Sequence, residues 1–305
     1  MTVDFGLSLL FGPPAGQNER FIDDITSAMP YVGGAMSSMW MTDHFFWHES
    51  PTFEAWTVMA YVAALFPTMQ IGPMVLGQNY RNPALTAKMA STLHALSGGR
   101  FIMGIGAGWK EDEYRAYGYP FPEPKVRLEQ LQDTLEIFTR LWNEPGKVTY
   151  EGRHYSVADA WCEPKPSPKI PIVVGGGGRK TMSLAVKYAD MWNISDANLT
   201  TFKEKLVTLR EHCETQGREW HSLRKTWFGR LSVGATEQEA VARAAARNYT
   251  RDNAFIGTPD QLVEQLLAFV DVDCDYFMID IIDSPNPELL AMVCEGVIPR
   301  VKAGR

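Results

Sequence analysis

The chain has 305 residues, of which 45% are hydrophobic and 21% are charged, a composition typical of a soluble globular protein with enough apolar side chains for a core. The net charge of −7 argues against nucleic acid as a partner, because proteins that bind it carry a basic surface stripe. No apolar run approaches the roughly 20 residues of a membrane span and no signal peptide is visible, so we expect a cytoplasmic protein with no membrane partner.

Short β-rich runs alternate with amphipathic helical segments along the chain, a pattern typical of a parallel sheet with crossover helices. The eight predicted strands are 3–10, 38–42, 70–76, 101–105, 170–174, 191–194, 227–233 and 276–282. Because eight strands close a barrel, the predicted fold class is α/β, a (β/α)8 TIM barrel formed as one domain over residues 1–305.

Two regions exceed a bare barrel. Residues 148–157 alternate like a β-hairpin and predict an insertion after strand 4. Two helices are expected to start at Thr236 and Thr258, where a Glu or Gln three residues on completes a capping box. Both helices precede the last strand, so they predict a second insertion before strand 8.

The end of the second strand carries Asp43 and His44. In a TIM barrel the functional residues lie at the carboxyl ends of the strands, so both side chains should enter the mouth together. A histidine can hold or accept a proton near neutral pH, and the adjacent carboxylate could orient it, which makes the pair a candidate for acid/base catalysis. The alternative is that His44 only forms structural hydrogen bonds.

Glycines follow the third and fourth strands. Gly77 interrupts an apolar run where a ligand would lie, and Gly106 and Gly108 belong to a GxGxG sequence whose spacing differs from the GxGxxG dinucleotide fingerprint. Such glycines allow a flat ring to approach the backbone. The next residue, Trp109, either stacks on that ring or fills the mouth. The acidic run 111–113 is expected to be a solvated helix start, although one of its side chains could face the mouth.

Four consecutive glycines, Gly175, Gly176, Gly177 and Gly178, end the fifth strand, and Arg179 leads into a helix. Glycine backbones can direct several N–H groups at one anion, and the helix dipole adds positive potential there. The stretch therefore predicts a phosphate site, against the alternative of a turn that binds nothing.

We expect no metal centre. The four cysteines are far apart and form no CxxC pair, so neither a zinc site nor a disulfide framework is indicated. The histidines other than His44 share no ligand spacing; they are His48, His94, His154, His212 and His221.

Several motifs occur in a characteristic order. They are Asp43-His44, Tyr80-Arg-Asn-Pro-Ala84, the stretch from Gly99 to Trp109, Tyr114 to Tyr119, Gly175 to Gly178 and Ala189 to Asn193. As an ordered set they resemble the bacterial-luciferase-like superfamily of monooxygenases (LLM). Within it the chain is most similar to oxidoreductases that use the deazaflavin coenzyme F420.

The resemblance implies a barrel that holds a flavin or deazaflavin at its mouth, usually as a homodimer. Asp43 and His44 would lie beside the ring, with His44 as proton donor or acceptor. Met74 to Gly77 would form a bulge against the far face of the ring, with a non-proline cis peptide at Met74-Val75. The glycine turn with Arg179 would hold the cofactor phosphate.

Trp47 and Trp109 are predicted to line an apolar substrate pocket. Sugar-phosphate dehydrogenases that use F420 look similar but have a glutamate where this chain has Trp109. This departure argues against the sugar-phosphate reaction and leaves His44 as the one well-placed proton carrier.

Three functional hypotheses follow. The first is an F420-dependent oxidoreductase that transfers a hydride between the deazaflavin C5 and a small-molecule substrate. The second is an FMN-dependent monooxygenase, which would need a flavin reductase as a partner. The third is a non-catalytic flavin-binding protein.

Overall fold

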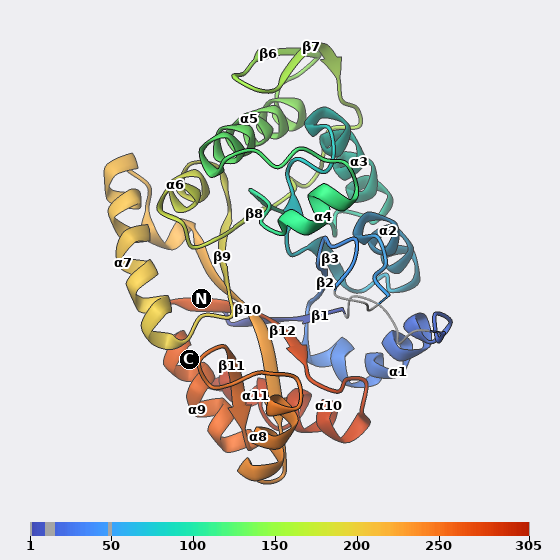
Figure 1. Ribbon diagram of the computed structural model, residues 1–305, viewed down its shortest axis with the longest axis vertical. Coiled ribbons are helices and arrows are strands. Elements are labelled where there is room, and N and C mark those ends of the chain that lie inside the picture. The colour runs from blue at the N-terminus through green and yellow to red at the C-terminus, as the bar shows by residue number, and fades with distance from the viewer. Residues whose placement is uncertain (1, 10–15, 48–50, 305) are drawn as a thin grey trace.

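The computed structural model describes residues 2–9, 16–47 and 51–304 (Figure 1). The strands are β1 (Asp4–Ser8), β2 (Ser38–Met41), β3 (Gln70–Pro73), β4 (Leu76–Gly77), β5 (Met103–Gly106), β6 (Lys147–Glu151), β7 (Ser156–Trp161), β8 (Ile172–Gly175), β9 (Met191–Ser195), β10 (Arg224–Val233), β11 (Ala254–Gly257) and β12 (Cys274–Ile281). The helices are α1 (Arg20–Ala35), α2 (Ala55–Leu65), α3 (Pro83–Leu96), α4 (Glu111–Ala116), α5 (Pro124–Asn143), α6 (Arg179–Tyr188), α7 (Leu199–Gln216), the 3-10 turn η1 (Trp220–Ser222), α8 (Glu237–Ala245), α9 (Pro259–Val270), α10 (Pro287–Cys294) and α11 (Ile298–Ala303). None of the helices in the described ranges is both long and apolar enough to cross a membrane.

The main sheet follows the order β3-β2-β1-β12-β10-β9-β8-β5-β4, and the pairings along this path are parallel. Its two ends, β3 and β4, are the halves of the predicted third strand. A bridge between Ile71 and Phe101 joins β3 to the strand region of β5, so the sheet closes on itself. The predicted (β/α)8 barrel is confirmed, with a strand at each of the eight predicted positions; Leu10, the predicted end of the first strand, lies outside the described residues.

The insertion after strand 4 is also confirmed. β6 and β7 form the antiparallel hairpin that was predicted around residues 148–157, and it lies over α5 (Figure 1). Asp133 of α5 is buried and holds the hairpin, because its carboxylate accepts hydrogen bonds from the Tyr150 hydroxyl at 2.8 Å and from the His154 N–H at 2.7 Å.

The insertion before strand 8 consists of α8, β11 and α9. Thr258 and Gln261 form the predicted capping box, whereas Glu239 bonds the N–H of Ala235 instead of completing the box at Thr236. β11 was not predicted, since a run of four residues directly before a helix cap is too short to be recognised as a strand. It pairs with the carboxyl half of β10 and extends the sheet there.

The barrel interior is filled by side chains and leaves the mouth as the place for a ligand. The buried interior cluster consists of Trp40, Met74, Ile102, Val173, Met191, Phe228, Tyr276 and Met278. At the amino ends of the strands, the Ser38 hydroxyl lies 2.5 Å from the Tyr276 hydroxyl and accepts the Trp40 indole N–H at 2.7 Å. Large aromatic side chains whose polar atoms are hydrogen-bonded therefore fill the amino-terminal end of the barrel.

Candidate active site

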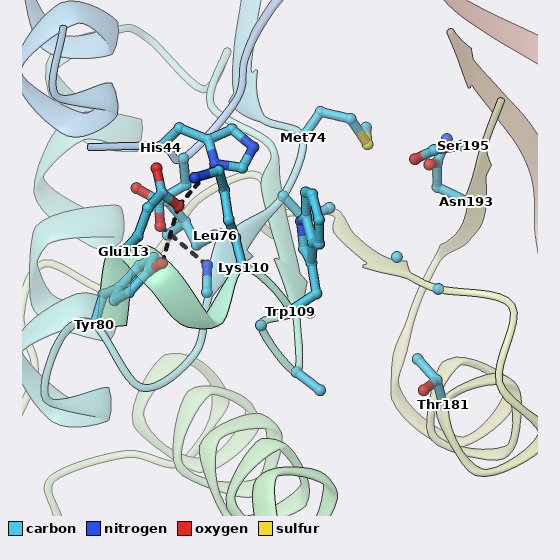
Figure 2. A pocket seen from close by; sticks show the side chains of 18 residues that line it. His44, Met74, Leu76, Tyr80, Trp109, Lys110, Glu113, Thr181, Asn193 and Ser195 are labelled. Atoms are coloured by element: carbon cyan, nitrogen blue, oxygen red, sulfur yellow. Dashed lines mark hydrogen bonds and ion pairs between the residues drawn. The ribbon is translucent and has the colours of Figure 1, made fainter. Parts of the chain in front are cut away.

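A cavity of ≈ 350 Å³ opens at the carboxyl ends of β2, β4, β5, β8 and β9 (Figure 2). Predicted site residues supply much of its wall: Asp43, His44, Met74, Val75, Gly77, Gly106, Gly108, Trp109, Gly175 and Gly176. Leu76, which belongs to the predicted bulge, also lines the cavity, and residues without a predicted role complete the lining: Tyr80, Ala107, Lys110, Glu113, Thr181, Asn193 and Ser195. Its volume lies in the range of small-molecule sites.

The wall between β3 and β4 contains the predicted cis peptide bond at Met74-Val75. Glycines of β5 and β8 make room for this bulge. A Cβ on Gly106 would lie 2.9 Å from Val75 Cγ2, one on Gly175 would lie 3.0 Å from Val75 Cγ1, and one on Gly104 would lie 1.9 Å from the Pro73 carbonyl oxygen. These glycines therefore make room for the bulge, whereas Gly106 was expected to make room for a ligand ring.

Asp43 is buried and faces the bulge. Its Oδ2 accepts hydrogen bonds from the Gly77 N–H at 3.0 Å and from Arg81 Nη1 at 2.9 Å, and its Oδ1 accepts from Arg81 Nη2 at 3.0 Å. Burial opposes the charge of Arg81, but the carboxylates of Asp43 and Glu54 outweigh it and raise the pKa of Arg81. The expectation that Asp43 orients His44 is wrong, because both oxygens of Asp43 are held by Arg81 and a different carboxylate bonds the His44 ring.

The carboxylate that contacts His44 belongs to Glu113, at 2.9 Å between Oε2 and Nδ1. The other oxygen of Glu113 accepts the N–H groups of Phe45 at 2.8 Å and Phe46 at 3.1 Å. Burial disfavours the charge of Glu113, yet the hydrogen bonds from His44 and from these two N–H groups prevail and lower its pKa. Glu113 is thus an ionised, fully buried carboxylate.

Both alternatives for the acidic run 111–113 occur: Glu111 and Asp112 form the expected solvated helix start, and Glu113 is the side chain that faces the mouth. The short helix α4 turns Glu113 and Tyr114 inward, while Glu111 and Asp112 stay exposed. The available sequence signal was the aromatic residue directly after Glu113, which marks the inward face of α4. Helical spacing alone did not show which acidic side chain shares that face.

Two tyrosines support the pair of His44 and Glu113. The Tyr80 hydroxyl donates to Glu113 Oε2 at 3.3 Å, and its ring stacks on Tyr114 with centroids 4.3 Å apart. The Tyr114 hydroxyl donates to Asn79 Oδ1 at 2.6 Å. Burial is the main cause that raises the pKa of both tyrosines, so both stay protonated donors.

Aromatic side chains form the rim of the cavity. Trp109 is 66% exposed and meets His44 edge to face, with centroids 5.9 Å apart. Trp47 lies behind both, 4.9 Å from the His44 ring and 6.1 Å from the Trp109 ring. Lys110 Nζ lies 4.4 Å from the centre of the Phe46 ring and bonds Asp112 at 2.6 Å. Of the two predicted pocket residues, Trp109 lines the cavity and Trp47 packs behind it.

The glycine turn contributes only its first half to the cavity. Gly176 has a φ of +133°, a conformation that favours glycine, and Thr181 of the first turn of α6 lines the wall with it. Gly177 and Gly178 lie outside the set of lining residues, and so does Arg179, whose guanidinium bonds Glu211 of α7 at 2.9 Å. No side chain caps α6 at Gly178.

Within the described ranges, no three His, Cys, Asp or Glu side chains gather where one metal ion could bind them. His48 lies outside these ranges. The four cysteines are buried free thiols: Cys162, Cys213, Cys274 and Cys294.

Comparisons with known proteins agree on one family. Residues 34–251 match luciferase-like monooxygenases. An F420-dependent glucose-6-phosphate dehydrogenase from Kineococcus radiotolerans is 32% identical over 214 residues, and a pyrimidine monooxygenase from Enterobacter cloacae is 29% identical over 225 residues. These matches cover 68% and 72% of this chain but only 62% and 59% of the relatives. The fold superposes on an F420-dependent secondary alcohol dehydrogenase in complex with an F420-acetone adduct, with a TM-score of 0.86, 19% identity and 99% coverage of both chains.

Proposed function

The chain belongs to the luciferase-like monooxygenase family and is an oxidoreductase, and on this premise we propose that it transfers a hydride between the C5 atom of coenzyme F420 and a small organic substrate. The observation that carries this proposal is the pair of His44 and Glu113 on the cavity wall. A positioned histidine with a buried carboxylate is what proton transfer at a substrate oxygen requires.

The residues around the cavity fit a deazaflavin with a phosphate tail. The bulge from Met74 to Gly77 offers an apolar face for a flat ring. Because Gly178 provides no cap, the first N–H groups of α6 are available to an anion, beside the Thr181 hydroxyl on the wall. When bound, F420 supplies the hydride chemistry, and the protein supplies position and electrostatics.

His44 is the proposed catalytic residue. A carboxylate can only accept hydrogen bonds, so Nδ1 of His44 carries a proton in its contact with Glu113. Nε2 is then the nitrogen that gains or releases a proton at the substrate oxygen. The buried charge of Glu113 stabilises the imidazolium that forms, which makes Glu113 a positioning residue.

Asp43 is assigned to the cofactor-facing wall. By accepting the Gly77 N–H while Arg81 clamps both of its oxygens, it fixes the end of the bulge against the mouth. Glu54 holds the same guanidinium at 2.5 Å and caps α2 through the N–H of Trp56 and Thr57. The bulge is thus tied to a helix end, and a cofactor ring would meet a preorganised surface.

An FMN-dependent monooxygenase is the second candidate, favoured by the monooxygenase among the relatives. It would require reduced flavin from a separate reductase. A deazaflavin has carbon where FMN has N5 and reacts poorly with oxygen, so the two candidates differ in cofactor more than in fold. Trp109 on the cavity wall, with Trp47 packed against it, would serve an apolar substrate in either case.

Titration of the purified protein with F420 and with FMN, followed by ring fluorescence, tests the proposal. We expect saturable binding of F420 at micromolar concentration and at least tenfold weaker binding of FMN. Tighter binding of FMN would replace the proposal by the monooxygenase candidate, and binding of neither would reject both.

We also infer a homodimer that forms through α2. The exposed positions of this helix recur every three or four residues and carry no charge: Thr57, Ala60, Tyr61, Ala64 and Leu65. Light scattering after size-exclusion chromatography should report a dimer for the wild type and a monomer for the double variant Tyr61→Lys, Leu65→Lys. A monomeric wild type would contradict the inference.

A further inference from the structure

A cluster of three charged side chains lies at the mouth on the wall opposite the bulge. Phe228 of β10 and Met278 of β12 are paired in register and pack inside the barrel. Because side chains alternate along a strand, the next inward positions toward the carboxyl ends are Arg230 and Asp280, which are also paired in register. In the barrel order, β10 and β12 face β4 and β5 across the mouth.

The third member of this Arg230 cluster connects it to the cavity. Asp196 follows Ser195, which lines the cavity and is paired in register with Phe228. The Asp196 carboxylate lies 3.5 Å from Arg230 Nη1, and Asp280 Oδ2 lies 3.4 Å from Arg230 Nε. Ser195 is the link between the cluster and the cavity, because Arg230, Asp196 and Asp280 are not themselves among the lining residues.

The hydrogen-bonding capacity of the cluster is not used up. Both contacts of Arg230 are longer than a good charge-assisted hydrogen bond, which measures about 2.7–2.9 Å. Arg230 is only 8% exposed, and its Nε is a buried donor with no hydrogen-bond partner among the described residues. The Thr42 hydroxyl, two positions beyond the interior residue Trp40 on the β2 side of the mouth, likewise lacks a partner there. An unsatisfied buried polar atom is costly, so these atoms indicate a polar ligand.

The charges of the cluster define that ligand. One guanidinium contacts both carboxylates, and burial raises the pKa of both Asp196 and Asp280 in spite of Arg230 and, for Asp280, in spite of Arg247 as well. Further negative charge would add to this imbalance, so a phosphate is disfavoured. A hydroxyl group suits the site because it can accept a hydrogen bond from Arg230 while it donates one to Asp280 or Asp196.

We propose that the Arg230 cluster is a substrate subsite that binds a second hydroxyl group of an uncharged substrate, while the reacting carbon lies near His44. This inference rests on the proposed function for the position of the reacting carbon. It distinguishes the substrate from a sugar phosphate and names its class as a neutral diol or polyol, or the corresponding hydroxy-ketone.

Three small probes that differ in one group test the subsite: propan-2-ol, propane-1,2-diol and propane-1,2-diol 1-phosphate. Each is titrated against the F420-loaded protein and against the cofactor-free protein, with tryptophan emission as the binding signal and F420 reduction as the second readout. In the wild type we expect the diol to bind about tenfold more tightly than propan-2-ol, as one hydrogen bond to a charged group gives, and the phosphate to bind no better than propan-2-ol.

Asp280→Asn and Arg230→Gln should each reduce the preference for the diol to less than about threefold, and Asp280→Asn should improve binding of the phosphate. Asp283→Asn is the matched control, because Asp283 is a half-exposed partner of Arg243 and Arg247 outside the cluster, and it should keep the wild-type preference. Thermal unfolding of each variant confirms that it is folded.

Equal or absent binding of the diol and propan-2-ol in the wild type, or a diol preference that both cluster variants retain, would overturn the subsite. Tightest binding of the phosphate would also overturn it. These outcomes are separate from failure of the proposed function, which appears as failure of F420 to bind at all.

Discussion

β10 and β12 carry an arginine–aspartate contact at each of their ends, and the two contacts differ. At the amino ends, Arg224 Nε bonds Asp275 Oδ1 at 2.8 Å and its Nη2 reaches the Asp275 carbonyl at 2.9 Å and Asp4 at 3.0 Å. At the carboxyl ends, Arg230 reaches its two aspartates only at 3.4 and 3.5 Å.

The pKa shifts at the two ends also differ. Burial opposes the charge of Arg224, but Asp275 and Asp4 outweigh it and raise the pKa of Arg224. At the other end, burial outweighs Arg230 and raises the pKa of Asp196 and Asp280. The same residue types on the same two strands therefore form short contacts at the amino ends of the strands and long contacts at the mouth. Short contacts stabilise the fold, and long contacts at the mouth leave hydrogen-bonding capacity for a ligand.

The largest effect should come from breaking the short contact of Arg224 with Asp275. Arg224→Ala leaves the Asp275 side chain, 1% exposed, without its guanidinium and should cost about 3 kcal/mol of unfolding free energy. Arg230→Ala should cost less than half as much, since its contacts are longer and its carboxyls can protonate. Urea unfolding of both variants measures the difference. Equal losses would show that the two ends are energetically alike.

A mouth residue that performs chemistry should show the reverse pattern. His44→Ala should lower kcat/KM at least about 100-fold, because general acid/base catalysis is lost, while F420 affinity and the unfolding midpoint change little. Steady-state kinetics with parallel cofactor titration separates these quantities. Unchanged turnover would remove His44 from the mechanism, and a comparable loss of F420 affinity would make it a binding residue.

Glu113 should affect both stability and catalysis. Its carboxylate is buried at the mouth, where it bonds the catalytic His44 and accepts the backbone N–H groups of Phe45 and Phe46. Its folded pKa is lowered, so its ionised form stabilises the protein above the ordinary value near 4.5, and this stability is lost as the pH falls through the lower folded pKa. Glu113→Gln should cost about 2 kcal/mol at pH 7 and progressively less below pH ~4.5.

Unfolding free energies of the wild type and Glu113→Gln between pH 7 and pH 3 test this dependence. If the difference in unfolding free energy between the two proteins stays constant with pH, the charge of Glu113 does not stabilise the fold. A second, kinetic measurement tests the positioning role. We expect the pH profile of kcat to shift in Glu113→Gln, which a purely structural role would not produce.

Local sequence patterns were sufficient for the barrel because each strand is a β-rich run followed by a helix, and the closing order follows from the parallel topology. The resemblance added the cis peptide at Met74-Val75, which no periodicity indicates. β11 was missed because four residues before a capping box carry too little pattern.

The sequence predicted where the candidate site lies in the barrel, but it did not predict which carboxylate contacts His44. Which carboxylate contacts His44 depends on how α4 packs against the segment after β2, a tertiary fact, so the neighbour in sequence was chosen over Glu113. Arg230 and Asp280 lie in strands that read as apolar runs, and only the register across β10 and β12 brings them together at the mouth.

Arg179 provides the smallest expected effect and shows that a short distance alone does not make a contact strong. Its bond to Glu211 is 2.9 Å long, yet both side chains are more than half exposed, so solvent screens the pair. Arg179→Ala should change unfolding free energy by less than about 0.5 kcal/mol. The Arg179→Ala variant should also weaken F420 binding less than about threefold, because the Arg179 guanidinium is directed to α7 and the first N–H groups of α6 are left for the phosphate.

Gly176→Val is the matched variant at the half of the turn that lines the cavity. The φ of +133° at Gly176 disfavours any side chain, so this variant should weaken F420 binding at least tenfold. A tenfold loss in Arg179→Ala would instead mean that Arg179 leaves Glu211 and binds the phosphate, as the sequence first indicated.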